Sequence, residues 1–266
     1  MIAVTETLLF YLALGAFAGV MAGLLGVGGG LIIVPALAWI FHLQGVAEAV
    51  IMHLAIGTSL ATIVVTSISS VRAHHRLGAV LWPVFWRLTP GIVAGAWLGA
   101  AIADALPSAA LRVVFGVFVL LVAAQLGFGA KPAPHRTLPG AAGMFAAGGV
   151  IGLVSAIVGI GGGSLTVPWL TWCNTSIRNA VATSAACGLP IALAGAAGFI
   201  VTGWGETGLP PWSLGYIYGP AMAGVAVASM LFAPLGARLA HTLPTIALKR
   251  VFAGFLAIVG VKMLMG

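Results

Sequence analysis

The sequence predicts an all-α integral membrane protein built from two inverted-topology repeats. Each repeat is expected to contain a glycine-broken helical hairpin plus three membrane-spanning helices. Three observations lead to this fold class: an apolar and charge-poor composition, ten apolar runs in two groups of five, and a glycine-rich motif that occurs twice.

The composition is typical of a chain that lies in a membrane. Of its 266 residues, 61% are hydrophobic and only 6% are charged, and the mean hydropathy is +1.18. Soluble domains carry roughly a quarter of charged residues. The four acids, Glu6, Glu48, Asp104 and Glu206, fall at the ends of apolar runs or between them, which argues against a proton relay of membrane-buried carboxylates.

The apolar runs form two sets that are separated by a linker. The segment "GAKPAPHRTLPG" at 129–140 is rich in proline and charge and is the natural boundary. The predicted domains are a first membrane repeat at 1–128, a cytoplasmic linker at 129–140 and a second membrane repeat at 141–266. The runs cover about 7–25, 31–41, 49–71, 80–103 and 109–127, then 140–158, 164–173, 180–201, 212–235 and 246–264.

The glycine-rich motif indicates that one half duplicates the other. The stretch "GLLGVGGGLIIVP" at 23–35 returns as "AIVGIGGGSLTVP" at 156–168, with Gly26, Gly28, Gly29, Gly30 and the Val-Pro pair at 34–35 repeated at a constant offset of 133 residues. A Thr-Ser pair at 58–59 returns at 183–184, at an offset of 125 residues. Offsets that change only by loop insertions are typical of an internal repeat.

The basic residues predict how the two repeats are oriented. The loop "RAHHRLG" from Arg72 is strongly basic, whereas its counterpart at 202–211 has no Lys or Arg. The net charge of +7 is first of all such an orientation signal, because cytoplasmic loops collect Lys and Arg. The two loops are therefore expected on opposite sides of the membrane, which makes the repeats antiparallel, with both termini facing outward. The basic cluster at 72–76 either attracts a cytoplasmic anion or only sets the topology.

The two glycine motifs are predicted to interrupt helices inside the protein. A helix over 31–41 spans only about 16 Å, about half of the hydrocarbon core. We expect each motif to form the tip of a hairpin, where the next short helix offers free N–H groups and the positive end of its dipole. Two such tips entering from opposite sides would form a midplane anion site made largely of main chain. The predicted donors are Gly28, Gly29, Gly30, Gly161, Gly162 and Gly163.

An alternative is that these glycines only let helices pack closely. Two sets of glycines are expected to do so at four-residue spacing: Gly15, Gly19 and Gly23, and Gly91, Gly95 and Gly99. A triple glycine suits a turn better than a packing face. A nucleotide-binding motif is excluded, because no strand precedes the glycines and no acid follows at the right distance.

Five side chains are predicted to assist the main-chain donors. Thr58, Ser59, Thr183 and Ser184 are candidate hydroxyl donors, because the Thr-Ser pair recurs at the equivalent place. Hydroxyls in membrane helices also bond the preceding turn or join helices, which is the alternative role. His53 is a candidate for donating to the anion or for carrying a coupling proton, and the alternative is a satisfied core histidine.

The doubled "GxGGGxxxVPxL", the stretch "HLAIGTSLATIVVTSISSVRAHHRLGAV" and the later "PLGARLAHTLP" together resemble the sulfite exporter TauE/SafE family. The resemblance covers nearly the whole chain. It implies a multi-pass bacterial inner-membrane protein that moves sulfite, sulfonates or related organosulfur anions. The second half keeps the Thr-Ser pair in "ATSAACGLPIALAG" but lacks the histidine, so two half-sites are expected to differ chemically.

The predicted function is a secondary transporter that moves a small sulfur-containing oxoanion by alternating access, with the sulfur identity implied by the resemblance alone. Uncharged donors suit transport, because a fully charged site would release its anion too slowly. An anion channel with the same lining is the nearest alternative. An enzyme is not expected, because the spans show no paired carboxylates, metal cluster or nucleophile–base set, and a scaffold would have no use for two matching helix breaks. The expected partners are the anion, membrane lipid and a coupling proton, without cofactor, metal or nucleic acid.

Overall fold

A computed structural model describes residues 4–25, 29–128, 137–239 and 245–265 of the chain. Within these ranges the chain is helical apart from one short β hairpin. In chain order the elements are α1 (Val4–Leu25), α2 (Gly30–Leu43), α3 (Ile51–Arg76), α4 (Trp82–Ala105), α5 (Ser108–Gly127), α6 (Ala141–Val158), α7 (Gly163–Trp172), α8 (Ile177–Thr202), β1 (Ser213–Leu214), β2 (Ile217–Tyr218), α9 (Gly219–Leu239) and α10 (Thr245–Met265).

Each of the ten predicted apolar runs contains one helix, and the all-α fold class is confirmed. The run at 212–235 differs at its start, because the helix begins only at Gly219. Residues 213–218 form an antiparallel hairpin in which Ser213 pairs with Tyr218. Gly215 makes the turn with φ +54°, and the following Tyr-Ile-Tyr sequence is rich in residues that favour strands.

The lengths of the helices divide them into spanning and short elements. Six helices in the described part of the chain are long and apolar enough to cross a membrane: α3, α4, α5, α6, α8 and the 219–236 part of α9. In contrast, α2 has 14 residues and α7 has 10, so they extend only about 21 Å and about 15 Å. The chain is therefore a multi-pass membrane protein in which both glycine motifs are followed by a helix too short to span.

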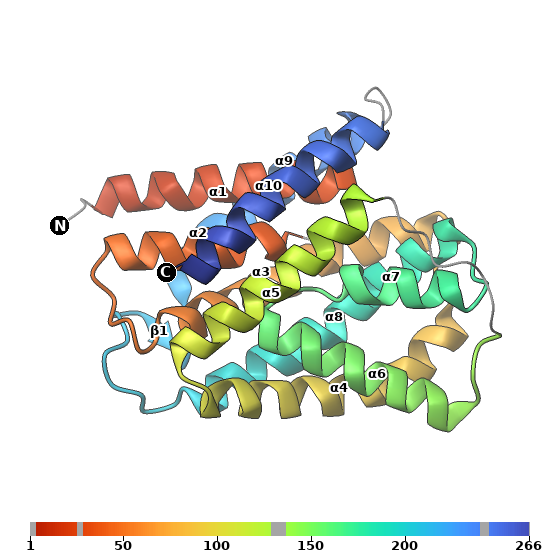
Figure 1. Ribbon diagram of the computed structural model, residues 1–266, viewed down its shortest axis with the longest axis horizontal. Helices are drawn as coiled ribbons and strands as arrows, with labels where there is room; N and C mark the ends of the chain where they lie inside the picture. Colours follow the sequence, from red (N-terminus) through yellow and green to blue (C-terminus); the bar gives the residue numbers. More distant parts are fainter. Residues whose placement is uncertain (1–3, 26–28, 129–136, 240–244, 266) are drawn as a thin grey trace.

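The helix packing pairs elements from the two halves of the chain. The extensive contacts join α4 to α6, α1 to α9, α5 to α10 and α3 to α8. Figure 1 shows these helices lying along one another in an elongated bundle. If α1–α5 are exchanged for α6–α10, this set of four pairs is unchanged, because α4–α6 becomes α9–α1 and the other two pairs map onto themselves.

The centre of the bundle is formed by α3 and α8. In their apolar windows, 78% of α3 and 56% of α8 are buried, against 33% of α5. A Cβ added to Gly57 of α3 would lie 3.2 Å from Cβ of Phe199, and one added to Gly188 of α8 would lie 3.3 Å from Oγ of Ser67. Later residues of α3 thus meet earlier residues of α8, so these two central helices are antiparallel.

Glycines allow the closest helix contacts outside this centre. A Cβ on Gly15 would lie 2.5 Å from the carbonyl oxygen of Val225, and one on Gly19 would lie 2.6 Å from that of Ser229. Such distances are too short for a real side chain, so α1 and α9 approach backbone to backbone. The expected packing role is confirmed here, and it is equally clear between α4 and α6 for Gly91, Gly95 and Gly99.

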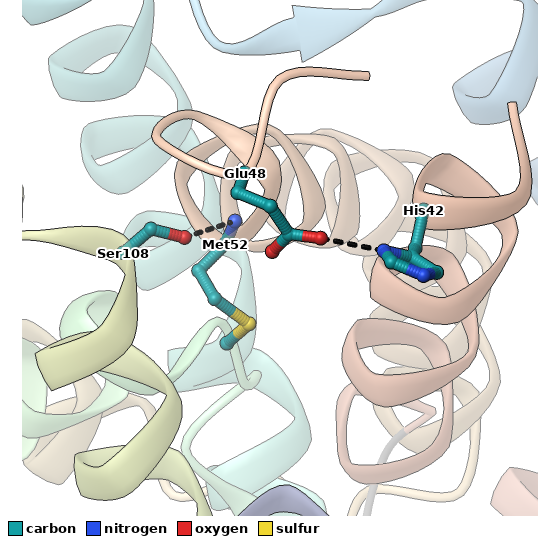
Figure 2. Close-up of polar contacts among 4 residues, drawn as sticks. All are labelled: His42, Glu48, Met52 and Ser108. Atoms are coloured by element: carbon teal, nitrogen blue, oxygen red, sulfur yellow. Dashed lines mark hydrogen bonds and ion pairs between the residues drawn. The ribbon is translucent and has the colours of Figure 1, made fainter. Parts of the chain in front are cut away.

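Polar contacts secure the connection between α2 and α3 (Figure 2). Nδ1 of His42 at the end of α2 hydrogen-bonds the carboxylate of Glu48, and both side chains are exposed. The amide of Met52 donates to Oγ of Ser108 at 3.2 Å. Since Val50 at the N-cap of α3 has no side-chain acceptor, the first turn of α3 is capped by a residue of α5 instead.

Candidate functional site

The starts of the short helices α2 and α7 lie inside the protein. The start of α2 touches the turn that precedes α7. Gly29 is the N-cap of α2 and Gly162 is the N-cap of α7, and neither makes a side-chain cap hydrogen bond. A Cβ on Gly30 would lie 2.6 Å from the carbonyl oxygen of Gly159 and 3.0 Å from Cα of Ile160. Gly30 and Gly159 are buried. The two glycine motifs therefore meet directly, although they are 133 residues apart in sequence.

The turn between α6 and α7 depends on glycine for its backbone conformation. Gly159 and Gly162 both have φ +75°, in the left-handed region that glycine adopts readily. The amides of Gly159 and Ile160 donate to the carbonyl oxygen of Ser155 at 2.9 and 3.0 Å, which ends α6. The chain then reverses into α7 within four residues.

The first turn of α7 presents main-chain donors. The amides of Leu165 and Thr166 donate back to the carbonyl oxygen of Gly162 at 3.1 and 2.8 Å. The preceding amides, of Gly163 and Ser164, belong to the first helical positions, which have no intrahelical acceptor. These two N–H groups carry the positive end of the α7 dipole, so the start of α7 can bind an anion.

Helices α3 and α8 hold this turn from both sides. Oγ of Ser59 on α3 donates to the carbonyl oxygen of Gly159 at 2.8 Å, and Ser59 is fully buried. A Cβ on Gly188 of α8 would lie 3.0 Å from the carbonyl oxygen of Gly161. The predicted residue Ser59 is thus beside the predicted glycines, but its proton already bonds the turn. In this structure Ser59 positions the backbone.

Three hydroxyls around this turn have no protein partner. Oγ of Ser155, Oγ of Ser164 and Oγ1 of Thr166 are buried without a hydrogen bond, and the whole side chains of Ser155 and Thr166 are buried. Measured from the position a Cβ would take on Gly162, Oγ1 of Thr166 is 3.4 Å away and Oγ of Ser155 is 3.6 Å away. A buried unsatisfied hydroxyl is unfavourable by about 1–3 kcal/mol. The hydroxyls of Ser155 and Thr166 are therefore available to hydrogen-bond a ligand or water.

Ser155, Ser164 and Thr166 were not among the residues predicted from sequence. The repeat itself carries the signal that could have found them. At the offset of 133 residues, the first half has Ala22, Leu31 and Ile33 at these places. Polar residues that break the match between two copies of an apolar motif mark a difference in chemistry between the copies.

The other predicted hydroxyls do not converge on the turn. Oγ1 of Thr58 accepts from the amide of Tyr218 in β2, and Oγ1 of Thr183 accepts from the amide of Leu81 before α4, both at 3.0 Å. Ser184 is buried without a partner, one helical turn from Gly188 on the same face of α8. Their binding role remains a prediction, as does that of the glycines. Gly26 of the motif and the predicted donor Gly28 lie outside the described residues.

His53 lies at a separate polar cluster near the hairpin. Its Nε2 donates to the carbonyl oxygens of Ala103 at 3.0 Å and Leu106 at 3.1 Å, where α4 ends. The ring stacks on Tyr216 with centroids 4.9 Å apart, and His53 is buried. Six residues separate His53 from Ser59, or about 9 Å along α3. The geometry favours a structural role for Nε2, and Nδ1 has no protein partner.

The same cluster includes a tyrosine–aspartate contact. The phenol of Tyr216 donates to Oδ1 of Asp104 at 3.1 Å. Burial, together with the neighbouring charge of Asp104, raises the pKa of Tyr216 above its ordinary value. The phenol therefore keeps its proton and remains a hydrogen-bond donor.

A basic cleft lies at the end of α3 that is farthest from His53. The guanidinium of Arg178 at the start of α8 donates to the carbonyl oxygen of Leu77 at 2.9 Å, beside this end. The side chains of Arg72 and Arg76 are exposed. The cleft has a volume of about 460 Å³ and is lined by Val65, Ile68, Ser69, Arg72, Ala73, Arg76 and Met230.

Comparison with known proteins is consistent with this architecture. Residues 11–263 match the model of a family described as sulfite exporter TauE/SafE. A "probable membrane transporter protein" of Haemophilus influenzae is 38% identical over 257 residues, which is 96% of this chain and 97% of the relative. One of Methanocaldococcus jannaschii is 26% identical and covers 94% of this chain and 93% of the relative.

A third protein with such a name, from Bacillus subtilis, is 33% identical over 174 residues, which is 58% of this chain and 64% of the relative. No solved structure matches the chain. The match to the family, over residues 11–263, therefore includes both glycine motifs, and the first two relatives each cover more than nine tenths of the chain.

Proposed function

Because the chain belongs to the sulfite exporter TauE/SafE family, we propose that it is a secondary transporter of a small sulfur-containing oxoanion. Sulfite, a sulfonate or a related organosulfur anion would cross the bacterial inner membrane by alternating access. The relatives are named as membrane transporters, and the sulfur chemistry of the cargo rests on the name of the family.

The observation that carries the anion-binding part of the proposal is the contact between the two glycine motifs. The start of α2 at Gly30 abuts the turn at Gly159 that leads into α7. Both helices begin at a glycine without a side-chain cap, so the first N–H groups of each have neither an intrahelical acceptor nor a capping side chain. Broken helices whose N-termini point at a buried site are a recurring device for anionic substrates in transporters.

Alternating access would use the two halves as inverted repeats. The antiparallel contact of α3 with α8 and the exchange of helix pairs between the halves support a two-fold relation between residues 1–128 and 141–266. In an inverted repeat each half can adopt the conformation of the other, which would open the site to either side in turn. The basic cleft at Arg72 and Arg76 would attract the anion on the cytoplasmic side.

The proposal is tested by uptake into proteoliposomes that contain the purified protein. The panel is sulfite, sulfate, thiosulfate and short sulfonates, each with and without a pH gradient. We expect saturable uptake of at least one sulfur oxoanion, and stimulation by the gradient would identify proton coupling. Protein-free liposomes and the Gly254→Ala variant, whose added Cβ meets no atom within 4 Å, are the controls.

Electrical recording on the same liposomes distinguishes a transporter from an anion channel with the same lining. Sustained unitary currents without saturation would favour the channel. Absence of any uptake or current across the whole panel would overturn the proposed function.

A further inference from the structure

We infer that the anion is bound by the second glycine motif alone, at the start of α7, through the hydroxyls of Ser155 and Thr166 together with main-chain N–H groups. We further infer that this site prefers singly charged oxoanions to doubly charged ones. The inference rests on the proposed function and specifies its site and substrate class.

The two hydroxyls are buried beside the start of α7 and have no partner. Ser155 is the residue whose carbonyl ends α6, and Thr166 is in the first turn of α7. Both side chains are fully buried, and neither hydroxyl has a protein partner. Both hydroxyl oxygens lie within 3.6 Å of the position a Cβ would take on Gly162, where Cδ1 at the flexible tip of Ile191 is the group that a ligand would displace. Buried hydroxyls are normally hydrogen-bonded, so two unpaired ones beside a free helix start indicate a place for a ligand.

The hydroxyl of Thr166 does not form the hydrogen bond that threonines in helices usually make, which supports a ligand site at this turn. Threonines in helices commonly bond the carbonyl oxygen of the preceding turn. In this protein Thr62, Thr89 and Thr171 do so, with oxygen–oxygen distances of 2.9, 2.8 and 3.0 Å to the residue four positions earlier. Thr166 could reach Gly162 in the same way but does not. Its hydroxyl is therefore left available on the side of Ser155.

The first half of the chain lacks these hydroxyls. The residues equivalent to Ser155 and Thr166 are Ala22 and Ile33, and Ile33 is buried in the core with its neighbour Leu31. An apolar first turn supplies no side-chain donors to an anion. The start of α2 would then cover the site from the opposite side, where Gly30 touches Gly159.

The donors around the start of α7 carry no formal charge. None of the Lys and Arg side chains whose burial the structure describes is buried, so the donors identified at this turn are neutral hydroxyls and amides. The desolvation penalty of an ion rises steeply with its charge. Neutral donors can balance the penalty of one charge more easily than that of two. A group of the form R–SO3⁻ fits this donor set better than sulfate does.

The test measures binding of methanesulfonate and sulfate to the purified protein by calorimetry. We expect wild-type protein to bind methanesulfonate at least about tenfold more tightly than sulfate. In the double variant Ser155→Ala, Thr166→Val the affinity for methanesulfonate should fall by about tenfold or more, since each hydroxyl donates to a charged group. Thr166→Ser keeps the hydroxyl and should remain within about threefold of wild type.

A matched control comes from the other half of the repeat. The double variant Ala22→Ser, Ile33→Val changes the equivalent positions and should bind methanesulfonate as wild type does. Thermal unfolding without ligand separates binding from folding: removal of two unpaired hydroxyls should leave the melting temperature unchanged or raise it, whereas loss of structural hydrogen bonds would lower it.

The outcomes separate this inference from the proposed function. Uptake of a sulfur oxoanion combined with unchanged affinity in the Ser155→Ala, Thr166→Val variant would overturn the inference and leave the function standing. Tighter binding of sulfate than of methanesulfonate would overturn the preference for single charge. Failure of the wild-type protein to bind or move any anion of the panel would overturn both.

Discussion

The two short helices begin at equivalent glycines, but their first turns differ in conformation and in chemistry. The N-cap of α2, Gly29, has ordinary right-handed geometry with φ −74°, whereas the N-cap of α7, Gly162, has φ +75°. Leu31 and Ile33 in α2 are buried hydrophobic residues, where α7 has Ser164 and Thr166 with unpaired hydroxyls. A glycine motif that recurs in the sequence thus precedes an apolar first turn in α2 and a polar first turn in α7.

The largest difference between the two halves is expected for Gly162→Ala against Gly29→Ala. Alanine at 162 must take positive φ and meets Cδ1 of Ile191, so the free energy of unfolding should fall by about 2–5 kcal/mol. Alanine at 29 keeps a normal φ, and its Cβ lies 3.0 Å from the flexible tip of Ile33, so the loss should stay below about 1 kcal/mol. Denaturant titration of the detergent-solubilised protein measures both values. Equal losses would contradict the asymmetry of the two turns.

A smaller difference is expected between Ser59→Ala and Ser184→Ala, which occupy equivalent places in α3 and α8. Removal of the Ser59 hydroxyl leaves the buried carbonyl oxygen of Gly159 without its donor and should destabilise the protein by about 1–3 kcal/mol. Ser184 has no partner to lose, so its replacement should change stability by less than about 0.5 kcal/mol. The same titration applies, and a larger loss at 184 than at 59 would reverse the assignment of roles.

The smallest difference concerns how α3 and α8 are capped. Ser108 on α5 accepts from the buried amide of Met52 in α3, whereas α8 uses its own exposed N-cap Ser176, which accepts from the amide of Asn179 at 3.3 Å. We expect Ser108→Ala to lower the free energy of unfolding by about 1 kcal/mol and Ser176→Ala by about 0.5 kcal/mol. The Gly254→Ala variant, whose added Cβ meets no atom within 4 Å, is the control for the effect of a neutral substitution. A greater effect at Ser176 would mean that the cap from α5 is not needed.

Most of the fold could be predicted because hydropathy along the chain reports directly on which segments lie in a membrane. The ten apolar runs, including the two that are too short to span, correspond to the ten helices in the described part of the chain. The hairpin at 213–218 was missed, because Ile217 and Tyr218 are as apolar as their helical neighbours, and only their pairing with Ser213 and Leu214 across the turn at Gly215 makes them a strand.

The candidate site could be predicted in part. The glycines of the second motif were identifiable because positive φ, as at Gly159 and Gly162, excludes most other residues. The hydrogen-bond partner of Ser59 could not be identified from sequence, because the acceptor is 100 residues away. Likewise, no local pattern places His53 against the end of α4 rather than beside the glycines.

From the order of its residues alone, this chain could be identified as a helical membrane protein with a glycine motif before a short helix in each half. Hydropathy, repeat spacing and the conformational freedom of glycine are local properties, so they can be read without knowing which segments touch. Which hydroxyls are already bonded and which are free was decided by the packing of α3, α6, α7 and α8. Hydrogen bonds form only within about 3.5 Å, and such distances between remote segments exist only once the helices have packed.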